Sequence, residues 1–536
     1  MDWSDHTIGS ALRKAAQTWP DDEFLVEGDE RFTFSAFDRR VDDLCSGLLE
    51  LGLKKGDHAA IWLTNGQDWL LIFLAAARLG VVLIPINTRY KLHELEYILR
   101  QSDAKLVVMM DELWGIDFYG MMAELVPGLA EQDPRALVTD RLPRLRAVAM
   151  WKGVRRPGTI ALSDLERSRS RRELPTVAPD DVALICYTSG TTGRPKGAMH
   201  SHAVLRQSAN VAKAMEMRPG GVALGHMPFY HVAGMFMAIL PCIQCGVRLV
   251  VMPSWNADRA LDLMEREGCT HFGGIPTHYI DCFDALARKP RNLSALHSAW
   301  IGGAAVTPEV VREARRAFGT PNILASYGMT ENTISTNFTR TNDPPETAEQ
   351  NKGRLSGEYE AKIVDPASGA ELPAGKVGAL LVRGHLVTLG YYKNEEATRA
   401  AFTDDGWFRT DDLGFFDLQG NLKVTGRVKE MFIVGGSNAY PAEIQQFLET
   451  HPAVRQSLVV GAPDRRLGQV GYAFVQLKPG ANASAEELVA FCRAGIADYK
   501  VPRHIAFIDE FPMTESGKLK RHVLVDQAEA AIAAQG

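Results

Sequence analysis

The sequence predicts an α/β protein: a large N-terminal domain of layered α/β sheets with a β-rich subdomain, followed by a small α+β C-terminal domain. Apolar extended runs alternate with helical patterns over residues 1–140 and again over 181–323, which is typical of parallel α/β layers. From about residue 362 the extended runs come closer together, which indicates antiparallel strands. After residue 427 the pattern changes again to a separate α+β unit.

The first part of the chain alternates regularly. Its spacing predicts helices at 8–19, 37–51 and 69–79, and strands at 58–63, 81–86 and 105–110. The apolar run 70–86 contains Arg78, Gly80 and Pro85, so a buried helix followed by a strand explains it better than a membrane span. Residues 141–172 are rich in arginine without interleaved aromatics, and they are predicted to form a solvated surface connection.

The rest of the chain is divided in the same way. The patterns predict strands at 181–187, 362–364, 378–382, 421–424, 457–460 and 473–477, and helices at 441–448 and 486–495. Residues 528–536 are predicted to be a low-complexity tail. The composition change at residue 427 places the domain boundary after residue 428, which gives an N-terminal domain 1–428 and a C-terminal domain 429–536.

Composition and charge exclude several classes of protein. The 536 residues include 59 Lys and Arg and 65 Asp and Glu, for a formal net charge of −6. This balance gives no electrostatic case for nucleic acid or an anionic membrane as the main partner. Seven scattered cysteines do not form a disulfide framework, and the acidic N-terminus lacks the apolar core of a secretory signal. We therefore expect a cytoplasmic protein without a membrane span.

A loop rich in hydrogen-bond donors follows the strand predicted at 181–187. Residues 188–197 read Thr-Ser-Gly-Thr-Thr-Gly-Arg-Pro-Lys-Gly, with four hydroxyl groups, three glycines and one lysine. Glycines let backbone N–H groups converge on an anion, and hydroxyls add further donors. The order differs from a Walker A loop. A flexible connection is the alternative, but this density of donors directly after a strand favours a phosphate-binding loop.

Residues 187–197 resemble the signature loop of the AMP-forming adenylate ligases, which comprise acyl-CoA synthetases, peptide-synthetase adenylation domains and beetle luciferases. Further segments resemble motifs of that family in the same order over nearly the whole chain: 227–234, 302–305, 326–331, 407–412, 426–430 and 512–518. Among these groups, the acyl-CoA synthetases are the most similar. The resemblance implies ATP and CoA as co-substrates and Mg²⁺ as a cofactor.

The resemblance also implies which residues contact ATP. They are Thr188, Ser189, Gly190, Thr191, Thr192, Gly193, Lys196, Gly303, Ala304, Ala305, Ser326, Tyr327, Gly328, Met329, Thr330, Glu331, Asp412, Arg427 and Lys518. Family members usually have Thr-Gly-Asp where this chain has Thr410-Asp411-Asp412. Register against Trp407 and Gly414 assigns the ribose hydroxyls to Asp412, with the neighbouring acid as the alternative.

Three residues are implied to be catalytic. Lys518 would bridge the carboxylate and the α-phosphate, because two anions must meet in the transition state. Thr330 would donate its hydroxyl to the α-phosphate. His231 would line the acyl pocket and steer the incoming thiol, with an ordinary core histidine as the alternative. Glu331 would hold Mg²⁺, a hard cation that prefers oxygen ligands.

The family moves its C-terminal domain between two half-reactions, so the C-terminal domain is expected to be mobile. Lys429 occupies the hinge position, and Gly435 and Gly436 would line the tunnel for the pantetheine arm of CoA. Without a Cβ, these glycines let a thin chain approach the backbone closely.

The acyl pocket is implied to contain Phe229, His231, Val232, Gly234, Met235 and Gly302. Relatives that activate amino acids place an Asp within the segment equivalent to 228–232, where this chain has no carboxylate. Burying a substrate ammonium group without a partner is costly, so amino acids are disfavoured. Fatty, alicyclic and aryl acids are all compatible with the apolar lining.

The sequence thus predicts an ATP-dependent carboxylate–CoA ligase that forms acyl-AMP and then acyl-CoA. The alternative is an enzyme that loads the acyl group onto a carrier protein, and a non-catalytic nucleotide sensor is a rival of another class. Lys518, Glu331 and Thr330 argue against the sensor. The sequence leaves open a homodimer and the identity of the acid.

Overall fold

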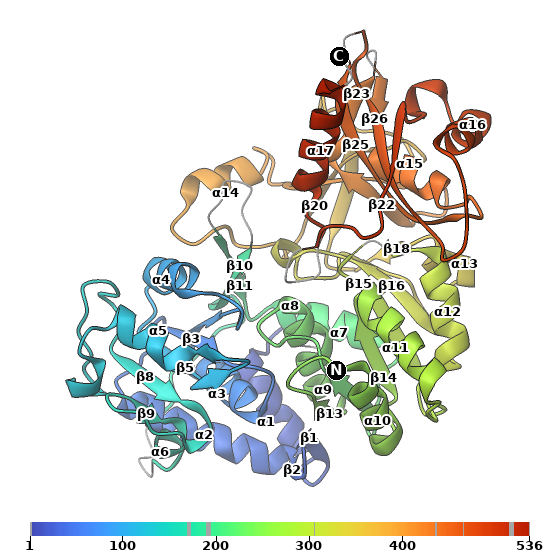
Figure 1. The fold of residues 1–536 in the computed structure, drawn as a ribbon. Helices are drawn as coiled ribbons and strands as arrows, with labels where there is room; N and C mark the ends of the chain where they lie inside the picture. The colour runs from blue at the N-terminus through green and yellow to red at the C-terminus, as the bar shows by residue number, and fades with distance from the viewer. Residues whose placement is uncertain are drawn as a thin grey trace. The chain divides into compact units, whose positions relative to one another are not determined.

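The computed structural model describes residues 3–168, 173–188, 195–304, 306–434, 437–464, 466–513 and 519–534. The chain divides into two compact units. Unit 1 consists of residues Met1–Glu360 and Arg383–Gly406, and unit 2 consists of Ala361–Val382 and Trp407–Gly536. The architecture is α/β, as predicted (Figure 1). The domain boundary after residue 428 stays a prediction.

The largest sheet of unit 1 has the strand order β18-β17-β16-β15-β14-β12-β13-β1-β2. Its strands are β1 (Glu23–Glu27), β2 (Glu30–Thr33), β12 (Val222–Gly225), β13 (Arg248–Val251), β14 (His271–Gly274), β15 (Ser298–Gly302), β16 (Ile323–Tyr327), β17 (Asn337–Phe338) and β18 (Lys352–Leu355). Neighbouring strands from β16 to β1 are parallel. Their carboxyl ends therefore share one edge of the sheet, where open α/β sheets bind ligands.

A second sheet of unit 1 has the order β11-β10-β4-β3-β5-β8-β9. Its strands are β3 (His58–Trp62), β4 (Val82–Pro85), β5 (Leu106–Met109), β8 (Ala147–Met150), β9 (Ile160–Ala161), β10 (Val182–Thr188) and β11 (Lys196–Ser201). Only the β10–β11 pair in this sheet is antiparallel. A short hairpin, β6 (Glu112–Leu113) with β7 (Ile116–Asp117), stands apart.

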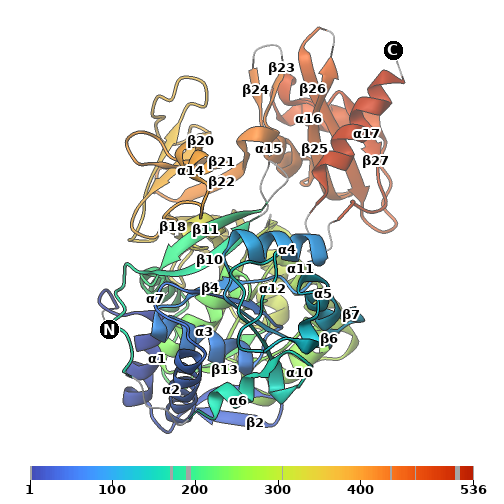
Figure 2. The ribbon, with the colours of Figure 1, turned by 90° about the vertical axis from the view of Figure 1, so that its left-hand side faces the viewer.

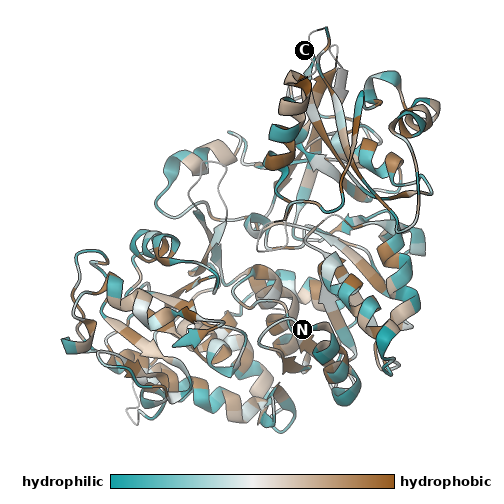
Figure 3. Ribbon diagram, in the orientation of Figure 1, coloured by the Kyte–Doolittle hydropathy of each residue, from teal (hydrophilic) through white to brown (hydrophobic). Residues whose placement is uncertain are grey.

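The helices of unit 1 cover both sheets. They are α1 (Ile8–Thr18), α2 (Phe34–Glu50), α3 (Gln67–Leu79), α4 (Leu92–Gln101), α5 (Phe118–Leu125), α6 (Leu162–Glu166), α7 (Val204–Ala214), α8 (Val232–Gly234), α9 (Leu240–Cys245), α10 (Ala257–Glu267), α11 (Pro276–Arg288), α12 (Pro308–Phe318), α13 (Pro345–Glu349) and α14 (Glu395–Ala401). Every residue of α3 is buried, which confirms a core helix. Figure 3 shows hydrophobic residues along the strands, whereas the surrounding helices carry both hydrophobic and hydrophilic residues.

Unit 2 contains two β-structures. One has the order β19-β20-β21-β22 and the other pairs β24-β23-β26-β25, with β27 beside β26. The strands are β19 (Glu360–Val364), β20 (Gly378–Arg383), β21 (Phe408–Phe416), β22 (Leu422–Arg427), β23 (Phe432–Val434), β24 (Ser437–Ala439), β25 (Val454–Asp464), β26 (Gly468–Leu477) and β27 (His504–Phe507). The helices are α15 (Pro441–Leu448), α16 (Ala485–Gly495) and α17 (Arg521–Ala533).

Two expectations about the fold are wrong. Residues 141–172 are not simply a solvated connection, because they contain the fully buried strand β8 and the short elements β9 and α6. Residues 528–533 are not a tail, because α17 continues to Ala533 and buries Leu524 and Ala528. In the first case the apolar run is only four residues long and lies among arginines, and in the second an alanine-rich helix has the composition of a low-complexity segment.

Within the described ranges, the structure contains no helix that is long and apolar enough to cross a membrane.

Candidate functional site

The predicted phosphate loop joins two antiparallel strands. Thr188 ends β10 and pairs with Lys196, which begins β11. Both side chains are half-buried, and the Thr188 hydroxyl lies 3.5 Å from the carbonyl oxygen of Lys196. The strand predicted before the loop is confirmed, and β10 and β11, which flank the loop, lie at one end of the strand order of the second sheet.

Helix α4 holds the segments on both sides of this loop (Figure 1, Figure 2). The hydroxyl of Tyr97 donates to the carbonyl of Pro195 at 3.1 Å. Gln101 accepts a hydrogen bond from the hydroxyl of Tyr187 and donates to the carbonyl of Tyr392 at 2.7 Å. Sequence reasoning missed these contacts, because the partners are about 90 to 290 positions apart and no local pattern signals them.

Glu331 lies next to the loop. Its side chain is buried, with 6% of the residue surface exposed, and Oε1 accepts a hydrogen bond from Thr188 Oγ1 at 3.1 Å. The backbone N–H of Thr388 donates to the carbonyl of Glu331 at 2.6 Å. The structure therefore brings together Thr188 and Glu331, which the sequence places 143 positions apart.

The backbone of residues 326–331 is fixed by the side chains of Asn332 and of Asn337 in β17. Asn337 Oδ1 accepts from the N–H of Tyr327 at 3.0 Å, and Asn332 Oδ1 accepts from the N–H of Met329 at 2.7 Å. A Cβ on Gly328 would lie 1.6 Å from the carbonyl oxygen of Ile334. Only glycine fits at this position, so the glycine predicted to contact ATP also has a structural reason.

His200 of strand β11 forms a hydrogen bond with the backbone of Thr330. His200 is fully buried, and burial lowers its pKa to about 4, while a hydrogen bond to the backbone of Thr330 acts in the opposite direction. The His200 ring is thus neutral near pH 7. It packs edge-on against Phe236 with ring centroids 6.2 Å apart.

The predicted adenine segment adjoins Ser326. Gly302 ends β15 and is paired in register with Ser326 of β16, and a Cβ on Gly302 would lie 2.5 Å from the Ser326 carbonyl oxygen. Gly303 and Ala304 follow as exposed residues. These residues and 326–331 lie together at the carboxyl edge of the parallel strands.

The residues of the predicted acyl segment, 229–235, are not all buried. Phe229 and Met235 are completely buried, and Val232 and Gly234 are also buried, whereas His231 is exposed at the start of α8. His231 is therefore not an ordinary core histidine. The ring of His231 packs against Tyr230 with centroids 4.8 Å apart.

The side chain of Asn65 holds the backbone where the predicted acyl segment begins. Its amide donates to the carbonyls of Gly225, Met227 and Met252, at 3.2, 3.0 and 3.2 Å respectively, and accepts from the N–H of Phe229 at 2.8 Å. Residues Met235–Ile239 then form a π-helical turn, a feature found often at functional sites. Sequence reasoning missed Asn65, whose partners are 160 or more positions away.

Unit 2 carries the predicted ribose acid. Asp412 is 5% exposed and lies 3.3 Å from Arg427 Nε, and its N–H donates to the hydroxyl of Thr410 at 3.0 Å. Asp411 is exposed and has φ +60°. This left-handed conformation favours glycine, the residue that the family usually has there, and it supports the register that assigns the ribose to Asp412.

Several predicted residues lie outside the described parts of the chain. These are Ser189, Gly190, Thr191, Thr192, Gly193, Ala305, Gly435, Gly436 and Lys518.

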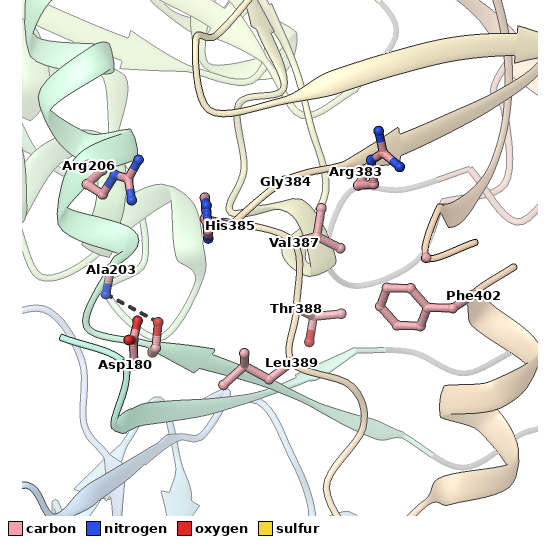
Figure 4. Close-up of a pocket in the computed structure, with 12 residues that line it drawn as sticks. Asp180, Ala203, Arg206, Arg383, Gly384, His385, Val387, Thr388, Leu389 and Phe402 are labelled. Atoms are coloured by element: carbon pink, nitrogen blue, oxygen red, sulfur yellow. Dashed lines mark hydrogen bonds between the residues drawn. The ribbon is translucent and has the colours of Figure 1, made fainter. Parts of the chain in front are cut away.

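A cavity of about 350 Å³ lies in unit 1 between the start of α7 and residues 383–406 (Figure 4). Its wall includes Arg206 and Arg383, which pair with Glu358 and Glu360 at 2.5 Å each. These ion pairs already neutralise the basic groups. Of the described residues that line this cavity, none belongs to the predicted site.

Comparisons with known proteins cover almost the whole chain. The family described as AMP-binding enzyme matches residues 12–392, and the AMP-binding enzyme C-terminal domain matches residues 443–518. The chain is 36% identical over 528 residues to the putative acyl-CoA synthetase YngI of Bacillus subtilis, covering 97% of this chain and 96% of that protein. It is 34% identical over 541 residues to the mitochondrial medium-chain acyl-CoA ligase ACSF2 of Danio rerio, covering 98% and 88%.

The fold is also similar to that of solved structures. The anthranilate CoA ligase AuaEII in complex with anthranoyl-AMP superposes with a TM-score of 0.84 at 26% identity, covering 99% of this chain and 98% of that one.

Proposed function

Because the chain belongs to the AMP-binding enzyme family and is an AMP-forming acyl-CoA synthetase, we propose that the acid it activates has an apolar tail of medium length. The carrying observation is the apolar, buried character of Phe229, Val232 and Met235, with no carboxylate in residues 228–232. The buried residues bear on the apolar character of the tail, and the medium length is supported by the relative ACSF2, which is named a medium-chain acyl-CoA ligase.

The reaction has two steps. A carboxylate oxygen of the acid attacks the α-phosphorus of ATP, and pyrophosphate leaves, which gives acyl-AMP. The thiol of CoA then attacks the acyl carbon, and AMP leaves with its phosphate, which gives acyl-CoA. Both ATP and CoA are substrates of this family, and the comparisons do not favour a carrier protein as the acceptor.

The residues proposed for the first step combine donors and positive charge. Lys518 would balance the charge of the two anions as they meet, and Thr330 would donate its hydroxyl to the α-phosphate. Asp412 would accept hydrogen bonds from the ribose hydroxyls, for which two carboxylate oxygens suit a vicinal diol. Each role is a proposal that rests on the family motifs.

Glu331 fits a magnesium ion bound with ATP. In the described ranges no group of three or more His, Cys, Asp or Glu could hold a metal by itself. Mg²⁺ commonly needs only one or two protein carboxylates together with substrate phosphates. The buried Glu331 carboxylate, beside the end of the phosphate loop, supplies such a ligand. The ion would neutralise phosphate charge as pyrophosphate departs.

We also propose a cytoplasmic location, since the seven scattered cysteines fit a reducing compartment.

A panel of acids tests the proposed substrate. AMP release would be measured with ATP, CoA and each acid from butyrate to palmitate, together with cyclohexanecarboxylate, benzoate and anthranilate. We expect the highest kcat/KM for octanoate or decanoate. Preference for an aryl acid would overturn the chain-length proposal. Replacing CoA with a phosphopantetheinyl carrier protein tests the acceptor, and we expect no thioester on the carrier.

A further inference from the structure

Residues 389–392 form an extended segment along the free edge of β11. The N–H of Leu389 donates to the carbonyl of Met199 at 3.0 Å, and the N–H of Met199 donates to the carbonyl of Gly390 at 3.0 Å. The N–H of Tyr392 donates to the carbonyl of Gly197 at 2.8 Å. The segment therefore follows the strand that leaves the phosphate loop.

This segment places the side chain of Tyr391 in contact with Glu331. Tyr391 is 8% exposed, and its hydroxyl donates to Glu331 Oε1 at 3.1 Å. Thr188 donates to the same oxygen at 3.1 Å. Two hydroxyls from different segments thus hold one oxygen of a buried carboxylate, which restricts a side chain that is otherwise rich in rotamers.

The face of the same ring contacts the phosphate loop. The ammonium of Lys196 lies 5.1 Å from the centroid of the Tyr391 ring, within the range of a cation–π interaction. Tyr391 therefore touches two groups of the predicted ATP site in different ways, Glu331 through its hydroxyl and Lys196 through its ring.

We propose that Tyr391 is a positioning residue that orients Glu331 for the divalent metal and seats Lys196 for the phosphates of ATP. This inference rests on the proposed function. Carboxylates that bind metals are in turn held by hydrogen bonds, and loss of such a partner typically costs about 10- to 100-fold in metal affinity. The backbone contact from Thr388 to Glu331 does not involve Tyr391, so the hydroxyl can be removed without removing that anchor.

The chain offers a matched control. Tyr392 is the adjacent phenol, and its hydroxyl donates to Asp103 at 3.0 Å. Tyr391→Phe and Tyr392→Phe each remove one buried or half-buried hydroxyl from neighbouring positions, and only the first touches Glu331. Tyr391→Leu removes the aromatic ring as well, so the difference between Tyr391→Leu and Tyr391→Phe tests the contact with Lys196.

Metal binding gives a readout that does not depend on turnover. Free Mn²⁺ would be measured by electron paramagnetic resonance in mixtures of enzyme and ATP without acid. We expect Tyr391→Phe to weaken Mn²⁺ binding about 10-fold and Tyr392→Phe to leave it within about twofold. ATP binding without metal, measured by calorimetry in EDTA, should be unchanged in Tyr391→Phe and weakened in Tyr391→Leu.

Activity then checks the consequence. Tyr391→Phe should need about 10-fold more Mg²⁺ for half-maximal AMP release, and excess Mg²⁺ should restore turnover. Wild-type Mn²⁺ affinity in a folded Tyr391→Phe enzyme, or equal weakening in Tyr392→Phe, would overturn the proposal. Failure of the wild type to release AMP with any acid would instead overturn the proposed function. The Mn²⁺ measurement would still show whether Tyr391 contributes to metal binding.

Discussion

The ammonium of Lys429 lies 3.5 Å from Oδ2 of Asp411, the residue that precedes the buried Asp412 in β21. Both side chains of this pair are more than half exposed, and such pairs contribute at most about 1 kcal/mol. A weak contact suits the proposed hinge, because the backbone at residue 429 can change conformation with little loss. Asp411 therefore has a local structural role that is distinct from the nucleotide-binding role proposed for Asp412.

The backbone at Asp411 predicts a difference between two substitutions. Asp411→Ala and Asp411→Gly both remove the pair with Lys429, but only alanine keeps a Cβ at φ +60°. We expect Asp411→Ala to be less stable than Asp411→Gly by about 1 kcal/mol. Thermal unfolding of both variants measures this difference, and an equal or higher Tm for Asp411→Ala would contradict it.

Asp412→Ala should weaken ATP binding. In the role proposed for Asp412, two hydrogen bonds to the ribose would be lost, each contributing about 1 kcal/mol or more, so we expect at least a roughly tenfold higher Kd for ATP. Calorimetric titration would measure it, and the ranking of acids should not change. Asp411→Ala is the control and should bind ATP like the wild type. The opposite result for the two variants would place the ribose contact one residue earlier.

Lys518→Ala should separate the two half-reactions. In the role proposed for Lys518, its charge is needed while the carboxylate meets ATP, but not when CoA attacks acyl-AMP. We expect loss of acyl-AMP formation in pyrophosphate exchange and retention of acyl-CoA formation from supplied octanoyl-AMP. Lys520→Ala, two positions away, provides the control. Equal losses in both half-reactions would indicate that Lys518 has a structural role.

Local patterns predicted most of the fold. The helix predicted at 441–448 has those bounds in the structure, and the strand predicted at 181–187 is β10 (Val182–Thr188). Periodicity suffices for such elements because it reports which residues are buried. It failed for Ala147–Met150, a strand of four residues among arginines. In α17, the spacing of Leu524 and Ala528 is a helical signal, but the alanine-rich composition of residues 528–536 is also typical of a low-complexity tail.

The site was only partly predictable from the sequence. Family motifs identified Thr188 and Glu331, which do lie in contact. Tyr391, Tyr97 and Asn65 act through contacts that join positions about 60 to 160 residues apart. Such pairings depend on the register of strands and on helix packing, which a single sequence does not contain.

Buried histidines predict that the folded protein loses stability in mild acid. His278 is 9% exposed in the first turn of α11, and its ring stacks on Trp255 with centroids 4.1 Å apart. Burial lowers its pKa to about 4 from the ordinary 6.5. Below pH 6.5 the unfolded chain therefore binds a proton at His278, whereas the folded protein binds it only near pH 4. The contribution of neutral His278 to folding stability is complete above pH 6.5 and is lost as pH falls toward 4.

His278→Phe isolates this contribution, because phenylalanine keeps an aromatic ring against Trp255 and cannot titrate. Lowering the pH from 7.5 to 5.5 should destabilise the wild type by about 1.4 kcal/mol more than the variant. Thermal unfolding at both pH values measures this as a Tm difference that shifts in favour of His278→Phe in acid. The exposed His385 gives the control, since His385→Gln should follow the wild type. Parallel pH profiles for wild type and His278→Phe would show that His278 titrates normally in the folded protein.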